Sequence, residues 1–137
     1  MPEILTTLAE ISPETSDSVT LRLDLGGAGF AYRPGQYVEI DPHQFDELAP
    51  AVAASESKKG FPESPRSFSI SSDAIEANVV EISVKEERPG PSLRIVTPFL
   101  VRRARPGLKI RLTGPNGQYC LPSSPPPVQG FLHLCAG

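Results

Sequence analysis

The run RSFS places an arginine, Arg66, two residues before an aromatic ring, Phe68, with Ser69 directly after it. Alternate residues of a strand share a face, so an extended backbone would put Arg66 and Phe68 together and Ser69 on the opposite side. A guanidinium binds phosphate through paired hydrogen bonds, and the ring offers a flat apolar surface. The pair suits a nucleotide with an aromatic head, although, taken alone, the run fits an edge-strand arginine over a core phenylalanine better.

A second group that could bind a ligand lies at the start of an expected helix. Thr97 is a good N-cap and Pro98 suits the first helical position, which predicts a short helix over about 98–104. The backbone N–H groups of Ile95, Val96 and Thr97 would lack intrahelical acceptors, and with the helix dipole they would attract an anion. Taken alone, the run is better explained by an ordinary capped helix that closes the fold.

Alternating apolar residues predict the strands that would carry these groups. In residues 18–25 the side chains of Val19, Leu21 and Leu23 fall on one face, and the run 79–85 alternates in the same way. Further strands are expected at 35–40, 66–72, 108–114, 118–121 and 131–137. We predict an all-β fold, a six-stranded antiparallel Greek-key barrel with one short helix, because closure removes the exposed edges of such short strands.

The length and charge of the chain narrow its function classes. At 137 residues it fits one domain, and residues 42–64 form a long excursion whose centre could be a short helix. The net charge is −3 and the 13 basic residues are scattered, so no nucleic-acid partner is expected. The one basic cluster could be a docking patch for an acidic electron partner or a solvated helix face, and its members are Arg102, Arg103 and Arg105.

Neither a targeting segment nor a metal-ligand pattern can be recognised. The N-terminus lacks a basic segment followed by an apolar core, and no apolar run approaches the roughly 18 residues of a membrane span, so we expect no membrane partner and a cytoplasmic location. Cys120 and Cys135 lack C-x-x-C spacing, which predicts no disulfide framework, zinc site or iron–sulfur site. His43 and His133 have no partner pattern and are expected to be structural or solvated.

Four motifs, in their order and spacing, resemble the FAD-binding domain of the ferredoxin-NADP reductase family. That family has an F-x-x-PGQ-type corner, an Arg-x-Tyr-Ser strand, a Gly-x-x-Ser helix start and a GP-x-G turn in this order. The corresponding runs here are PGQYVEI, RSFSISS, RIVTPFL and TGPNGQYCL. The resemblance covers nearly the whole chain from about residue 17, except the excursion 42–64.

The resemblance implies roles for side chains on the RSFS strand and at the helix start. Arg66 would hold the flavin diphosphate, and Phe68 would lie against the isoalloxazine or the ribityl chain. Ser69 would be the catalytic side chain, since it would hydrogen-bond near flavin N5, where hydride arrives. Arg94 would itself contact phosphate.

Backbone groups complete the site that the resemblance implies. Those of Ile82, Ser83 and Val84 would meet the pyrimidine edge of the flavin ring. Those of Ile95, Val96 and Thr97 would complete the diphosphate site. FAD is the expected cofactor rather than FMN, and no metal is expected.

The sequence departs from the family pattern at three of these positions. Phe68 stands where the family usually has tyrosine, so ring stacking is retained and the phenolic hydrogen bond is lost. Arg94 and Thr97 stand where the family usually has glycine and serine, and threonine can still cap a helix. These changes bear on flavin affinity and on FAD versus FMN more than on the fold.

The resemblance also implies a division of the chain. Residues 1–122 would be the flavin-binding β-barrel, 123–130 a linker and 131–137 the first strand of a truncated nicotinamide-binding domain. No glycine-rich dinucleotide fingerprint follows, so NAD(P)H would bind only with the missing domain. The apolar run 131–137 would then be left partly unburied, which favours self-association.

The expected function is that of a flavin domain in an NAD(P)H-dependent oxidoreductase, which passes electrons through FAD to an iron–sulfur or haem partner. The isolated chain would be incomplete for turnover. A second hypothesis is a non-catalytic β-barrel interaction or regulatory module with a decayed flavin site, favoured by Phe68 and Arg94. A third is an FMN or riboflavin site in a related barrel.

Overall fold

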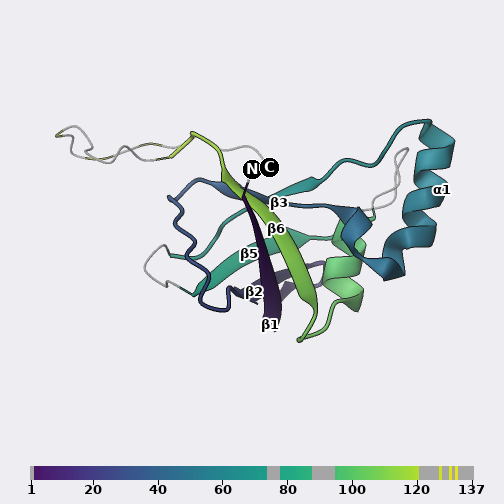
Figure 1. Ribbon diagram of the computed structural model, residues 1–137. Coiled ribbons are helices and arrows are strands. Elements are labelled where there is room, and N and C mark those ends of the chain that lie inside the picture. Colours follow the sequence, from purple (N-terminus) through teal and green to yellow (C-terminus); the bar gives the residue numbers. More distant parts are fainter. Residues whose placement is uncertain are drawn as a thin grey trace.

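The computed structural model describes residues 2–73, 78–87 and 95–120, together with residues 127, 130 and 132. Within these ranges six antiparallel strands form one curved sheet in the order β4-β3-β6-β1-β2-β5 (Figure 1). The strands are β1 (Glu3–Thr15), β2 (Ser18–Asp24), β3 (Tyr37–Ile40), β4 (Arg66–Ser69), β5 (Val79–Lys85) and β6 (Lys109–Asn116). The order is of the Greek-key type, as predicted.

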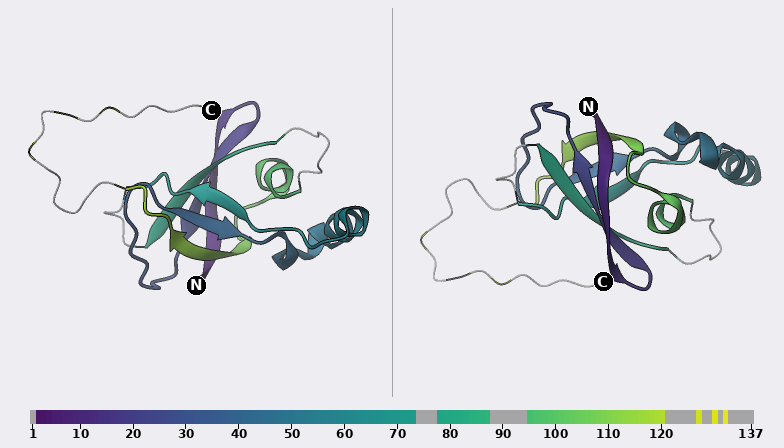
Figure 2. Two further views of the ribbon diagram at one scale, coloured as in Figure 1. Left: turned by 90° about the horizontal axis from the view of Figure 1, so that it is seen from above. Right: turned by 90° about the horizontal axis from the view of Figure 1, so that it is seen from below.

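The two outer strands, β4 and β5, approach each other, so that the sheet curls into a barrel (Figure 2). Among the described residues a single bridge, between Ile70 and Ile82, joins these two strands. Beside it the Ser71 N–H donates to the Glu81 carbonyl oxygen over 2.8 Å. We call the line along which β4 and β5 meet the seam. The predicted barrel is confirmed, with a seam that is hydrogen-bonded at one end.

The core of the barrel follows the predicted alternation. Leu21 and Leu23 of β2 and Ile82 of β5 are fully buried, and Leu21 pairs directly with Ile82 in the β2–β5 ladder. The residues between them on each strand face outward, and Arg22 of β2 pairs there with Glu81 of β5 over 2.7 Å. Alternation with a period of two therefore places the apolar side chains of both strands inside.

Two strand assignments differ from the sequence prediction. β1 is the first strand of the chain and lies between β6 and β2, although no strand is expected there. The apolar alternation is interrupted because Thr6 occupies a core position: it is 1% exposed and its hydroxyl donates to the Ile110 carbonyl oxygen over 2.7 Å. The expected strand at 118–121 is wrong, since residues 118–120 form no strand. β6 continues to Asn116 instead, and Gly117, with a φ of 106°, turns the chain.

The centre of the excursion, which the sequence allows to be a short helix, is helical, and two 3₁₀ turns precede it, so the fold has more helix than the one short helix of the prediction. The excursion holds two 3₁₀ turns, η1 (Pro42–Gln44) and η2 (Asp46–Leu48), and the helix α1 (Ala49–Lys59). Gly60, in the left-handed conformation with a φ of 83°, ends α1. The helix lies beside the barrel (Figure 1) and buries only Val52 and Ser55.

The predicted late helix is present but starts two residues earlier than expected. It consists of α2 (Val96–Pro98) and the π-helical turn η3 (Phe99–Arg103). Ile95 occupies the N-cap position and no side chain caps the helix, so the expected capping role of Thr97 is wrong. The centroid of the Phe99 ring lies 4.9 Å from that of Phe45, between η1 and η2, so this contact packs the helix against the excursion. No helix in the described part of the chain is long and apolar enough to cross a membrane.

Candidate functional site

The seam separates beyond the Ile70–Ile82 bridge. β4 is paired on its other side with β3, where Val38 lies opposite Phe68. If the bridge register continued for two residues, Phe68 would lie opposite Val84, yet no bridge forms there among the described residues. The facing edges of β4 and of residues 83–85 thus carry backbone donors and acceptors that no strand ladder between them uses. We call this part of the seam the open seam.

The side chains of β4 alternate as the sequence predicted. Phe68 is 8% exposed and belongs to the buried core, whereas the Arg66 side chain on the same face keeps 35% of its surface exposed. Ser69 is exposed and points to the opposite face. The strand therefore separates the serine hydroxyl from the guanidinium, and the phenylalanine is first of all a core residue.

On β5 the backbone, not the side chains, can reach a ligand at the open seam. The side chains of Ile82 and Val84 are buried in the barrel. Ser83 points outward, where its hydroxyl lies 3.1 Å from that of Thr20 on β2. A hollow of about 470 Å³ opens beside Ser83 and Val84, but neither Arg66 nor Phe68 lines it, so it does not unite the expected residues.

Glu87 links Arg66 to the start of the late helix. A terminal nitrogen of the Arg66 guanidinium lies 3.7 Å from a carboxylate oxygen of Glu87. The backbone N–H of the same glutamate donates to the Thr97 hydroxyl oxygen over 2.8 Å. The buried Thr97 hydroxyl thus receives a hydrogen bond from the segment after β5. Arg66 and the amides of the first helical turn are consequently brought to the same end of the barrel.

Arg102 holds the late helix against the end of β5. Its guanidinium donates to both carboxylate oxygens of Glu86, over 3.0 and 3.3 Å, and to the Ser16 carbonyl oxygen over 3.0 Å. Arg103 pairs with Glu47 and lies over the Phe99 ring. Arg105 donates to the carbonyl oxygens of Arg102 and Ala104, over 3.3 and 2.9 Å. All three arginines of the basic cluster therefore make contacts within the chain, which favours a structural role over a docking patch.

The groups at the open seam fit the chemistry of a flavin dinucleotide. A diphosphate needs cationic and N–H donors, and Arg66 with the first-turn amides of α2 supplies both types. The polar edge of a pyrimidine needs alternating donors and acceptors, which the backbone edge of β5 offers. Glu87 is the opposing feature, because its carboxylate shares the guanidinium that a phosphate would use. Arg94 lies outside the described residues.

The two glycine-containing turns that resemble family motifs contact each other. The side-chain amide of Gln36 donates to the Gly117 carbonyl oxygen over 3.2 Å, and its oxygen accepts from the Arg33 N–H over 2.8 Å. Gly35 approaches the Tyr119 backbone so closely that no Cβ could fit there. The corner before β3 and the turn after β6 therefore form one unit beside the strand pair β3–β4.

Several contacts of this region were not predicted from the sequence. Glu86 and Glu87 directly follow an alternating strand, and two acids at a strand end are a weak signal that resembles an ordinary solvated turn. His43 shows no partner pattern along the sequence, yet its ring contacts Asp41 and Glu56. Glu56 is 13 residues away on a helix of the excursion, a separation that no local pattern encodes.

Comparison with known proteins gives one curated relative. An NADPH oxidoreductase of Mycobacterium tuberculosis is 30% identical to this chain over an alignment of 128 residues, and the match covers 90% of this chain and 29% of that protein. The chain thus spans less than a third of the length of this relative. No family model matches the chain.

Solved structures share the fold over most of the chain. A cytochrome P450 reductase from Amycolatopsis has a TM-score of 0.66 at 24% identity and covers 89% of this chain and 30% of its own. A ferredoxin reductase of carbazole 1,9a-dioxygenase has a TM-score of 0.66 at 18% identity, with the same coverage. The FAD/NAD-binding domain of a nitric oxide dioxygenase from Vibrio cholerae has a TM-score of 0.64 at 21% identity, over 88% of this chain and 46% of its own. At identities this low, the structural likeness establishes the fold alone.

Proposed function

We propose that this chain, which has the fold of the FAD-binding domain of the ferredoxin-NADP reductase family, holds FAD as part of an NAD(P)H-dependent oxidoreductase. The observation that carries the proposal is the arrangement at the open seam, where Arg66 and the start of α2 meet through Glu87. A guanidinium and first-turn amides at one end of a barrel are the groups that a diphosphate requires.

Each of the chain's own groups has a part in this function. Arg66 and the backbone amides of residues 95–97 bind the diphosphate, and the backbone of residues 82–84 orients the ring through its pyrimidine edge. Phe68, which is 8% exposed, lies against the isoalloxazine or the ribityl chain with the part of its ring that the core leaves uncovered. Ser69 hydrogen-bonds near the nitrogen that accepts hydride. Bound FAD supplies the redox chemistry, which is hydride acceptance followed by release of single electrons.

The proposal also includes residues outside the described ranges and a second domain. Residues 123–130 serve as the linker and 131–137 begin the nicotinamide-binding domain, with residues 1–122 as the flavin barrel. NAD(P)H binds to that second domain, and electrons leave the flavin for an iron–sulfur or haem protein. Support comes from relatives whose names describe such reductases and which are much longer than this chain.

Flavin titration of the purified chain tests the proposal. The wild type is expected to quench the fluorescence of added FAD, and Arg66→Ala to raise the dissociation constant about tenfold to a hundredfold, since a charge-assisted hydrogen bond contributes about 1.5 to 3 kcal/mol. Arg111→Ala is the matched control, because Arg111 is an exposed arginine of β6 with a weak 4.0 Å contact to Glu3. A wild type that retains neither FAD nor FMN on dialysis refutes the flavin function of this chain.

A second candidate function is a non-catalytic interaction or regulatory module with a decayed flavin site. The burial of Phe68 and the carboxylate of Glu87 beside Arg66 are the observations that favour it. In that case the fluorescence of free flavin stays unquenched although the chain is folded. Mass analysis of the extracted cofactor separates FAD from FMN if flavin does bind.

A further inference from the structure

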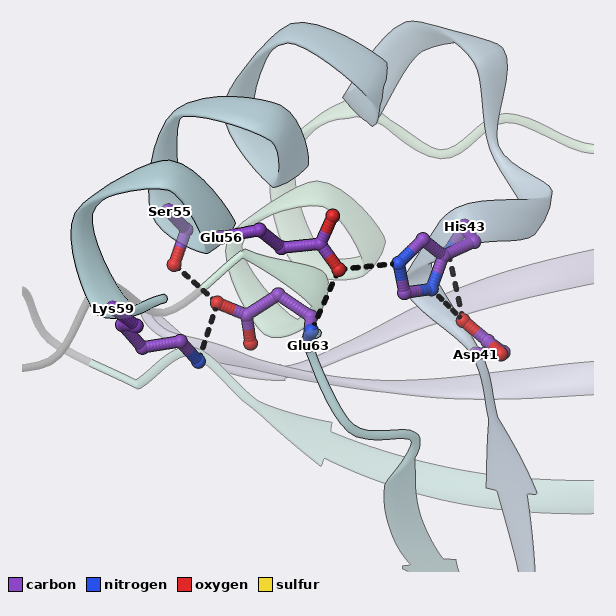
Figure 3. A network of polar contacts seen from close by, with 6 residues as sticks. All are labelled: Asp41, His43, Ser55, Glu56, Lys59 and Glu63. Carbon is purple, nitrogen blue, oxygen red and sulfur yellow. Dashed lines mark hydrogen bonds and ion pairs between the residues drawn. The ribbon is translucent and has the colours of Figure 1, made fainter. Parts of the chain in front are cut away.

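His43 joins a strand end of the barrel to the helix of the excursion. Its Nδ1 lies 2.5 Å from a carboxylate oxygen of Asp41, and its Nε2 lies 2.7 Å from a carboxylate oxygen of Glu56 (Figure 3). Asp41 follows β3 directly and caps η1, whereas Glu56 belongs to α1. The imidazole ring therefore bridges two elements through both of its nitrogens.

The two contacts require the doubly protonated ring. An ionised carboxylate can only accept hydrogen bonds, and a neutral imidazole carries a single N–H. Both carboxylates also accept backbone hydrogen bonds: the oxygen of Asp41 accepts the His43 N–H over 2.9 Å, and that of Glu56 accepts the Glu63 N–H over 2.7 Å. The bond from Glu63 lowers the pKa of Glu56. Hydrogen bonds with Asp41 and then Glu56 accordingly raise the pKa of His43 above its ordinary value of 6.5.

The same network reaches the other end of the excursion. Besides its backbone contact with Glu56, Glu63 accepts hydrogen bonds from Ser55, and from Lys59 over 2.7 Å, through its carboxylate (Figure 3). Glu63 lies three residues before Arg66, the first residue of β4. Because α1 buries so little apolar surface, its position beside the barrel depends largely on these polar contacts.

Charged groups of three strands surround the ring. A hollow of about 270 Å³ beside His43 is lined by Glu3 of β1, Glu39 of β3 and Arg111 of β6, as well as by Asp41. Carboxylates outnumber the one arginine, which favours the imidazolium. Among the described residues no set of three His, Cys, Asp or Glu side chains is arranged to hold a metal ion, so the network is a hydrogen-bonded one.

We propose that protonated His43 is a clamp that fastens α1 to the end of β3 and so fixes the segment through which the excursion enters β4. When the ring loses its proton, one of the two contacts must break. Asp41 is two residues away in the same turn, so the Nδ1–H contact persists and the longer-range contact to Glu56 is released. Helix α1 and the segment 60–65 are then held less firmly.

The sign of the pH dependence follows from the direction of the shift. The pKa of His43 is higher in the folded than in the unfolded chain, so the clamp is complete below about pH 6.5 and is lost as the pH rises through the folded-state pKa. The ring and its partners are partly solvated: 42% of the His43 side chain is exposed, 50% of that of Asp41 and 28% of that of Glu56. Water therefore weakens the two contacts, and the effect on α1 is a modest one.

Hydrogen exchange of the purified chain tests the clamp without any flavin. After correction for intrinsic exchange, the opening of α1 is expected to increase about two- to fivefold between about pH 6 and about pH 8.5. His43→Gln, with one side-chain N–H pair and no charge, should show the high-pH exchange of α1 at both pH values. His133→Gln removes the chain's other histidine and should behave as the wild type.

Three results would overturn the clamp. The first is equal protection of α1 in the wild type at both pH values, and the second is a pH dependence that persists in His43→Gln. The third comes from nuclear magnetic resonance of the wild-type ring: a His43 imidazole that is neutral at about pH 6 cannot make both contacts. This last measurement needs no variant, so it decides the question even if His43→Gln does not fold.

The consequence for ligand binding rests on the proposed flavin function. Because the clamp fixes the approach to Arg66, FAD affinity should fall about two- to fivefold over the same pH range in the wild type and stay level in His43→Gln. A chain that binds no flavin but shows the pH-dependent exchange refutes the proposed function and leaves the clamp intact. A chain that binds flavin but shows no such exchange refutes the clamp alone.

Discussion

At the scale of single residues, the tightest requirement in the described chain falls on Gly35. Its φ of 101° lies in the region that favours glycine, and an added Cβ would collide with the Tyr119 backbone oxygen. The residue sits in the corner that touches the turn after β6, next to the Gln36–Gly117 hydrogen bond. The glycine is therefore required both by backbone conformation and by close approach.

Gly35→Ala is expected to lower the free energy of unfolding by about 1 to 3 kcal/mol, because the alanine must either strain the backbone or push the corner away from the turn. Urea denaturation monitored by circular dichroism measures the loss. Gly29→Ala is the matched control, since Gly29 has an ordinary φ and open space around its Cβ position, and its effect should be close to zero. Equal effects of the two substitutions would contradict the close-approach argument.

At the scale of elements, the late helix owes its position to packing and to ion pairs, not to a capping side chain. Leu100 is fully buried and Phe99 nearly so, and Arg102 ties the helix to Glu86. Thr97, which the sequence predicts to be the N-cap, instead accepts a hydrogen bond from the Glu87 N–H through its hydroxyl oxygen. Tertiary contacts have overridden the local preference here.

Leu100→Ala should destabilise the chain by about 2 to 5 kcal/mol, since it leaves a cavity between the helix and the barrel. The neighbouring Val101 is only partly buried, so Val101→Ala is expected to cost clearly less. Thermal unfolding of the two variants and the wild type compares them. Similar losses for both would mean that the helix is not anchored through Leu100.

The sequence predicts most strands of the barrel because their side chains alternate without interruption, as in β2 and β5. It misses β1, where a threonine fills a core position through a hydrogen bond that depends on β6. It also cannot predict the Arg66–Glu87–Thr97 chain of contacts, because the three residues lie on separate elements. Motif order, in contrast, identifies the corner before β3 and the RSFS strand correctly even though each run is ambiguous alone.

At the scale of the whole molecule, the chain matches less than a third of its curated relative and of two similar structures. In the proposed function its barrel supplies donors for a diphosphate and for one edge of a ring. The described residues supply no second α/β unit to which a nicotinamide nucleotide would bind. Flavin binding and nicotinamide oxidation should therefore be separable.

We expect the flavin-loaded chain to be bleached by dithionite under anaerobic conditions and to remain oxidised on the same timescale with NADH or NADPH. The small reductant reaches the flavin directly, whereas productive hydride transfer requires a bound and oriented nicotinamide. Absorbance near the flavin band follows both reactions. Rapid reduction by NADPH with saturation kinetics would show that this chain alone binds the nucleotide.

The incomplete pairing of the seam links the proposed ligand to the integrity of the fold. Where β4 and β5 separate, the described residues of the two strands do not form backbone hydrogen bonds with each other, and in the isolated chain water must satisfy the amides and carbonyls along their facing edges. A molecule that binds both edges supplies hydrogen-bond partners in place of the missing strand pairing. By mass action any such molecule that binds only the folded chain raises the unfolding free energy by RT ln(1 + L/Kd), where L is its free concentration, so a melting temperature that rises with ligand concentration reports binding at the seam.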